Sequence, residues 1–155
     1  MSKQNKVDIV IIGPEEPLVN GITDFLKGKS VKVLGPSKFA AQLEGSKAFM
    51  KNLCKKNNIP TADFGVFDEY GRASDFIKKS KIPIVVKADG LAAGKGVLIC
   101  NSKDEAIIET KKILNGKFKS SKKVVLEEFL EGEELSYFIL VDKNSYSFFG
   151  SAQDH

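Results

Sequence analysis

The chain has 155 residues, of which 42% are hydrophobic and 28% are charged, a balance typical of a globular protein of about one domain. Its 24 basic and 20 acidic residues leave a formal net charge of +4, and its lysines are scattered, which argues against a nucleic-acid partner. The two cysteines, Cys54 and Cys100, match no metal or disulfide spacing, and no apolar run is long enough to span a membrane, so we expect a cytoplasmic protein with reduced thiols and no membrane partner.

The first residues predict one strand–helix–strand unit. Residues 7–12 form a strand of the buried type that ends at a Gly-Pro pair, and residues 31–34 form a second short strand with the same ending. Between them, apolar residues recur at helical spacing from Pro17 to Leu26, and Gly28 ends the helix. This order is typical of a parallel sheet, and one such unit is too small to fold alone.

Two helices and a linker follow. Ser37 is a candidate N-cap for a short helix that runs to Leu43, and Gly45 separates this helix from the next. Ser46 is a candidate N-cap for the second helix. Helical spacing puts four of its apolar residues on one face: Phe49, Met50, Leu53 and Cys54. Residues 57–60 predict a linker into a new lobe.

The middle of the chain predicts a compact α+β lobe. A strand at 64–67 and a helix at about 72–80 precede a strand–loop–strand segment that ends at Ile99. Ser102 and Glu105 form a capping box for a helix that runs to about Leu114, and residues 124–129 form a further strand. The order is therefore β-α-β-β-α-β. Residues 135–141 and 146–149 predict a hairpin that turns at 142–144.

The strand–loop–strand segment carries the strongest functional signal. The loop contains Gly90, Gly94, Lys95 and Gly96, and Lys87 interrupts the apolar strand before it. Glycines let backbone N–H groups approach an anion and the lysines add charge, so a polyphosphate is the expected ligand. The spacing excludes a Walker A loop and a dinucleotide fingerprint. A flexible hairpin with solvated lysines is the alternative, although a lysine within an apolar strand must reach water or an anion.

Several phrases occur in an order that is specific to one family. They are Gly13 to Val19, Gly35 to Lys38, Ala41 to Lys51, Ile59 to Ala62, Val85 to Val97, Glu127 to Glu134 and Ser151 to His155. In this combination the chain resembles the phosphoribosylamine–glycine ligase family, also called glycinamide ribonucleotide synthetase, of the ATP-grasp superfamily.

The resemblance implies a partial ATP-grasp fold of mixed α/β and α+β type, with an incomplete parallel-sheet unit at its N-terminus. It divides the chain into a partial substrate domain at 1–43 and a partial ATP-grasp domain at 44–155, with the flap lobe at about 62–130. Members of the family begin earlier and continue further, so the chain is expected to be an internal fragment. The ligands for Mg²⁺ are expected outside the chain, so no metal ligand is assigned within it.

The resemblance also implies roles for particular residues. Lys47 and Lys87 would contact the phosphates of ATP and support catalysis, and Gly90, Gly94, Lys95 and Gly96 would form a mobile lid. Glu127 would accept the adenine amine and Leu130 would pair with the ring through its backbone, with Glu128 and Phe129 as close alternates. Glu134 would accept the ribose hydroxyls. The residues facing phosphoribosylamine would be Gly13, Pro14, Glu15, Asp154 and His155.

Each of these residues also has an ordinary structural interpretation. Lys47 can be a solvated lysine at a helix start, the glutamates at 127–134 can be a solvated acidic turn, and residues 13–15 can be a plain strand-to-helix turn. His155, the single histidine, can be an inert terminal residue.

The implied activity is an ATP-dependent ligation in purine biosynthesis. Glycine would be activated as an acyl phosphate and then joined to 5-phosphoribosylamine, by positioning and electrostatics and without a side-chain nucleophile. The full-length enzyme would be a monomer, and the chain alone would bind ATP weakly and be inactive. A nucleotide-binding remnant without catalysis and another ATP-grasp carboxylate–amine ligase are the alternatives.

Overall fold

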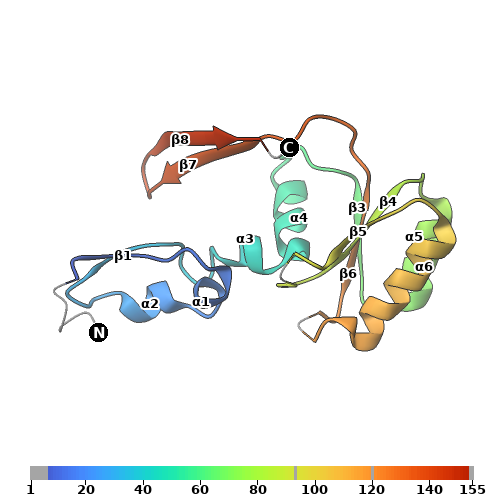
Figure 1. Ribbon diagram of the computed structural model, residues 1–155, viewed down its shortest axis with the longest axis horizontal. Helices are drawn as coiled ribbons and strands as arrows, with labels where there is room; N and C mark the ends of the chain where they lie inside the picture. The colour runs from blue at the N-terminus through green and yellow to red at the C-terminus, as the bar shows by residue number, and fades with distance from the viewer. Residues whose placement is uncertain (1–6, 93, 120, 154–155) are drawn as a thin grey trace.

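The computed structural model describes residues 7–92, 94–119 and 121–153. These residues form an N-terminal unit, a central sheet with its helices, and a separate C-terminal hairpin (Figure 1). None of the helices within the described residues is long and apolar enough to cross a membrane.

The N-terminal unit has the predicted parallel strands but not the predicted helix. Strand β1 (Ile9–Ile11) pairs in parallel with β2 (Lys32–Leu34). The continuous helix predicted from Pro17 to Leu26 is wrong, because α1 (Glu15–Val19) and α2 (Ile22–Leu26) are separate helices. Gly21, with φ of +93°, breaks the helical path between them. Strand β1 is not buried either: Ile9 and Ile11 are both exposed.

The next two helices are α3 (Gln42–Gly45) and α4 (Lys47–Lys56). Ser37 Oγ accepts the N–H of Ala40 as an N-cap would, but the chain turns there and α3 begins only at Gln42, with Gly45 as its last residue rather than a separator. The helix predicted to begin after Ser37 is therefore wrong.

The start of α4 is confirmed, because Ser46 Oγ accepts the N–H of Phe49. Phe49, Met50 and Cys54 of its predicted apolar face are half-buried. The buried residues of α4 are Ala48 and Lys51, whereas Leu53 is exposed.

The central lobe has the predicted β-α-β-β-α-β order. Its sheet comprises β3 (Phe64–Phe67), β6 (Val124–Glu128), β4 (Ile84–Ala88) and β5 (Val97–Cys100), which lie in that order with every neighbouring pair antiparallel. Helices α5 (Tyr70–Lys79) and α6 (Lys103–Lys112) cover one face (Figure 1).

The Ser102 N-cap of α6 is confirmed, while the return hydrogen bond of Glu105 goes to the residue before the N-cap. Ser102 Oγ accepts the N–H of Glu105, and Glu105 Oε2 accepts the N–H of Asn101. The α-helix ends at Lys112, and a π turn at Ile113–Lys117 continues it. The predicted helical end at Leu114 therefore falls inside that turn.

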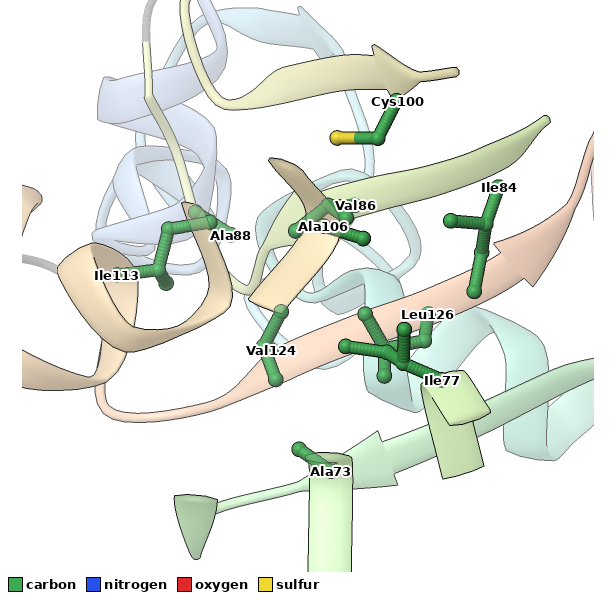
Figure 2. Packing of buried hydrophobic residues seen from close by; sticks show 10 residues of the cluster. All are labelled: Ala73, Ile77, Ile84, Val86, Ala88, Cys100, Ala106, Ile113, Val124 and Leu126. Carbon is green, nitrogen blue, oxygen red and sulfur yellow. The ribbon is translucent and has the colours of Figure 1, made fainter. Parts of the chain in front are cut away.

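The core of the lobe lies between the sheet and its two helices. It is formed by alternate residues of the central strands, such as Val86 of β4 and Leu126 of β6, packed on Ile77 of α5 and Ala106 of α6. Figure 2 shows ten side chains of this cluster converging from the strands and both helices. Because side chains alternate along a strand, the intervening residues of β4 and β6 lie on the opposite face.

The predicted hairpin is confirmed as β7 (Ser136–Val141) and β8 (Tyr146–Ala152), which are antiparallel. Asp142 Oδ1 accepts the N–H groups of Asn144 and Ser145 and so closes the turn. Nearly every residue of both strands is exposed on both faces.

Candidate functional site

The candidate site lies on the sheet face opposite the two core helices. Lys87 of β4 pairs in register with Val125 of β6, and Val85 pairs with Glu127. Lys87 and Glu127 are therefore diagonal neighbours on one face of adjacent strands, within reach of each other. Strand order brings together two residues that lie 40 positions apart in the sequence.

Three charged side chains meet on this face, and we call them the Glu127 cluster: Lys51, Lys87 and Glu127. Glu127 Oε2 lies 2.8 Å from Lys87 Nζ and 3.1 Å from Lys51 Nζ. The side chains of Lys51 and Glu127 are only 4% and 5% exposed, whereas that of Lys87 is 24% exposed. Burial strengthens the ion pairs and makes any loss of a partner costly.

Lys51 is held by several groups besides the carboxylate. Its Nζ donates to Thr61 Oγ1 at 2.7 Å and to the carbonyl oxygen of Ala62 at 3.4 Å. The same Nζ lies 5.6 Å from the centre of the Phe64 ring, within the range of a cation–π contact. Lys51 thus joins α4 and the segment just before β3 to the sheet.

The second oxygen of Glu127 has no hydrogen-bond partner in the described part of the chain. Glu127 Oε1 is buried and, among the residues that the structure describes, no group hydrogen-bonds to it. A buried carboxylate oxygen without a donor is rare and costs free energy. The oxygen is therefore available to a donor from a bound molecule.

The loop after β4 is tied to the first turn of α4. Asp89 Oδ1 accepts from Ser46 Oγ at 3.0 Å and from the N–H of Ala48 at 3.1 Å. Lys47 Nζ donates to the carbonyl oxygen of Gly90 at 3.0 Å. These bonds bring Lys47 to the end of β4, the strand that carries Lys87.

The predicted glycine loop connects β4 to β5 as a hairpin. Gly90 and Gly94 have φ of +89° and +73°, a region that favours glycine. A Cβ on Gly96 would lie 2.6 Å from Ala92 Cβ, so a larger residue there forces a shift. Lys95 is exposed.

The residues predicted to bind adenine follow β6. Glu128 is hydrogen-bonded to Asp63, the residue just before β3. Its Oε1 accepts the N–H of Asp63 and its N–H donates to the Asp63 carbonyl oxygen, both at 2.9 Å. Phe129, Leu130 and Glu134 are exposed.

The predicted phosphoribosylamine residues are not brought to the cluster. Gly13, Pro14 and Glu15 lie between β1 and α1, and Pro14 occupies the N-cap of α1 without a side-chain hydrogen bond. No hydrogen bond or ion pair among the described residues links them to the Glu127 cluster. Asp154 and His155 lie outside the described residues.

Sequence reasoning missed Lys51 and Asp89. One available signal is that Lys51 follows Lys47 by four positions and so shares its side of α4. Within the described parts of the chain, no three acidic, cysteine or histidine residues are grouped closely enough to hold a metal ion.

Comparison with known proteins assigns the family. Residues 45–155 match the family model of the ATP-grasp (A) domain of phosphoribosylglycinamide synthetase, and residues 1–44 match the model of its N domain. The chain belongs to the phosphoribosylglycinamide synthetase family. This confirms the resemblance drawn from the sequence phrases.

Relatives of this family match almost the whole chain. Phosphoribosylamine–glycine ligases of Mesorhizobium japonicum and Brucella melitensis are 48% and 46% identical over 154 and 155 residues, which is 99% of this chain in each case. The chain spans 36% of the length of each of these relatives.

Solved structures confirm the ATP-grasp fold. A phosphoribosylamine–glycine ligase from Thermotoga maritima superposes with a TM-score of 0.76 at 40% identity, covering 90% of this chain and 34% of that protein. A biotin carboxylase–β-γ-ATP complex from Campylobacter jejuni superposes with a TM-score of 0.78 at 15% identity, covering 97% and 35%. At that identity the second comparison supports the fold alone.

Proposed function

We propose that this chain supplies the nucleotide-binding part of an ATP-dependent ligase that joins glycine to 5-phosphoribosylamine. The family assignment supports this activity. The observation that carries it is the Glu127 cluster. One oxygen of the Glu127 carboxylate forms an ion pair with the partly exposed Lys87, and the other is buried and has no hydrogen-bond partner among the residues that the structure describes.

The hydrogen-bonding groups after β6 fit an adenine nucleotide. Glu127 Oε1 would accept the exocyclic amine of adenine, and the exposed segment at Phe129 and Leu130 would cover the ring, with the backbone of Leu130 pairing with it. Glu134 would accept the ribose hydroxyls. Glu128 is the alternate to Glu127, although its Oε1 already accepts from Asp63.

Lys47 and Lys87 would hold the phosphates. Both lie at the end of β4 that leads into the glycine loop, and ammonium groups offset the negative charge that develops during phosphoryl transfer. The loop from Gly90 through Gly94 and Lys95 to Gly96 would close over the triphosphate and exclude water. ATP supplies the phosphoryl group that activates a carboxylate.

The remaining assignments are proposals of the same kind. Gly13, Pro14 and Glu15, together with Asp154 and His155, would face phosphoribosylamine. The substrate part would end at residue 43 and the nucleotide part would begin at residue 44. Mg²⁺ would accompany ATP in the reaction, as is usual when phosphates are transferred.

The reaction balances without a side-chain nucleophile. An oxygen of the glycine carboxylate attacks the terminal phosphorus of ATP, the bond from that phosphorus to the bridging oxygen breaks, and ADP leaves, which gives an acyl phosphate. The amine of phosphoribosylamine attacks the acyl carbon, the bond to the phosphate oxygen breaks, and the amine loses a proton. The protein would contribute position and charge.

An NMR titration of the chain with Mg·ATP to millimolar concentrations tests the nucleotide part. We expect ATP to shift the amide signals of Gly90 and Glu127, and Lys87→Ala to weaken binding at least tenfold because one ammonium is lost from the phosphate site. Lys87→Arg should restore it only in part, since a planar guanidinium differs from a point charge. The matched control is Lys79→Ala, a lysine of α5 in the same lobe. Equal ATP affinity in Lys87→Ala and wild type would refute the assignment.

Exchange of the matching segment of the Mesorhizobium japonicum ligase for this chain tests the ligase activity. The exchanged enzyme should release phosphate only when glycine and phosphoribosylamine are both present. A folded exchanged enzyme that binds ATP but never couples it to both substrates would favour a nucleotide-binding remnant.

A further inference from the structure

We infer that Lys51 is a fixed counter-ion of Glu127 that allows Lys87 to exchange the carboxylate for a phosphate. Lys51 is thus a positioning residue that acts through Glu127 and Lys87 rather than by touching the ligand. The inference rests on the proposed function, in which Lys87 meets the phosphates of ATP.

The two lysines are bound to Glu127 in different ways. Both approach the same oxygen, Oε2. Lys51 also donates to Thr61 and Ala62 and is 4% exposed. Among the described residues, the Lys87 ammonium has Glu127 as its one hydrogen-bond and ion-pair partner, and the Lys87 side chain is 24% exposed. The less exposed lysine is therefore the anchored one, and Lys87 is the one that can move.

The charges make the exchange feasible. Two ammonium groups and one carboxylate leave the Glu127 cluster with one uncompensated positive charge, which favours an anion nearby. When Lys87 turns away, the Glu127–Lys51 pair remains neutral and hydrogen-bonded. Without Lys51, the same movement would leave a buried carboxylate with no counter-ion, and that state is strongly disfavoured.

A purely structural role for Lys51 makes a different prediction. If Lys51 only joined α4 to the sheet, its loss would lower stability but leave the Lys87 amine unchanged in a folded chain. If Lys51 shares Glu127 with Lys87, its loss makes Lys87 the sole counter-ion, so the Lys87 amine is held more tightly and becomes less reactive.

The first test needs no ligand. The rate at which an amine-acylating reagent modifies Lys87 is measured by mass spectrometry in the full 155-residue chain. Lys51→Met should slow acylation of Lys87 about fivefold or more. Lys55→Met is the matched control, because Lys55 lies one turn along α4, approaches the same Phe64 ring at 5.9 Å and is exposed, and it should leave the rate unchanged. An unchanged rate in folded Lys51→Met overturns the inference.

A double variant covers the case in which Lys51→Met fails to fold. Lys51→Met with Glu127→Gln removes both the cation and the anion from the buried site, so it should fold and release Lys87. Acylation of Lys87 should then be faster than in wild type. A rate no faster than wild type in this folded double variant also overturns the inference.

The second test separates this inference from the proposed function. In NMR titrations, Lys51→Met should weaken binding of Mg·ATP about tenfold and leave binding of adenosine, which has no phosphate, unchanged. If Lys87→Ala leaves ATP affinity unchanged, the proposed function fails, while the acylation rates still report on the charge sharing. If Lys87→Ala weakens ATP binding and folded Lys51→Met does not, the inference fails alone.

Discussion

At the scale of single residues, the candidate site depends on a lysine to which the sequence analysis gave no role. The side chain of Lys51 is 4% exposed, and its charge is accommodated because Glu127, Thr61 and the Ala62 carbonyl surround it. Helical spacing puts the apolar residues of α4 on one face and gives no reason for a lysine to be buried. The partner that buries Lys51 lies on β6, and only the tertiary structure brings that partner near.

The two cysteines should differ in reactivity at the same scale. Burial, and secondarily the negative charges of Glu105 and Glu109, raise the pKa of the Cys100 thiol to about 11. At pH 8 only about one Cys100 in a thousand would then be a thiolate, the form that reacts. Cys54 is less buried.

We expect iodoacetamide to modify Cys54 at least ten times faster than Cys100 at pH 8, as measured by mass spectrometry on the folded chain. Denaturant should remove the difference, which provides the control. Similar rates for the two thiols in the folded chain would contradict the assigned environment of Cys100.

At the scale of elements, the end of α6 is held by charges that cross the π turn. Glu109 Oε1 accepts from Lys112 Nζ at 2.6 Å, and Glu109 Oε2 accepts from Lys117 Nζ at 2.7 Å. Hydrogen bonds from Lys112 and then Lys117 lower the pKa of the Glu109 carboxyl below 4.5. Because the folded-state pKa is depressed, this stabilisation is fully present above pH 4.5 and is lost as the pH falls through the lower folded value.

Glu109→Gln should therefore lower the free energy of unfolding at pH 7. It should have little effect at pH 3, where more of the Glu109 carboxyl is protonated. The two lysines are 54% and 37% exposed, so solvent screening limits the loss to about 1 kcal/mol or less. Urea unfolding at pH 7, 5 and 3 measures it. Asp75→Asn, which removes a more exposed pair with Lys78, should have a smaller effect. A loss that is equal at every pH would refute the charge-based explanation.

The elements themselves were predictable to different degrees. The strands of the central sheet and of the hairpin were predicted because apolar runs bounded by turn residues are strong local signals. The break at Gly21 and the π turn at Gly116 were not, because both depend on a left-handed glycine that helical spacing ignores. Lys87 and Glu127 were recognised as site residues, but their contact was not, since it requires β6 to lie beside β4.

At the scale of the whole molecule, burial is concentrated in the central lobe. Strands β4 and β6 are buried on both faces over most of their length, whereas the β7–β8 hairpin and the β1–β2 pair expose large apolar residues such as Ile11 and Phe149. Exposed apolar strands are prone to association with other chains. The parts of the chain should therefore differ widely in local stability.

Hydrogen exchange should reveal this difference. Amides of β4 and β6 should exchange most slowly, and those of β1, β2, β7 and β8 should exchange at least a hundredfold faster, because few buried contacts oppose their opening. Exchange followed by mass spectrometry in dilute solution measures this, with concentration varied as a control for association. Equal protection of the hairpin and β6 would contradict it.

The alternation along β4 and β6 has one practical consequence. Positions 84, 86 and 88 face the core, and positions 85 and 87 face the candidate site. Val85, Val125 and Glu127 are themselves buried, whereas the side chain of Lys87 is 24% exposed. Residue 87 is therefore the position of the site face at which a protein engineer can vary recognition with the least disturbance of the interior.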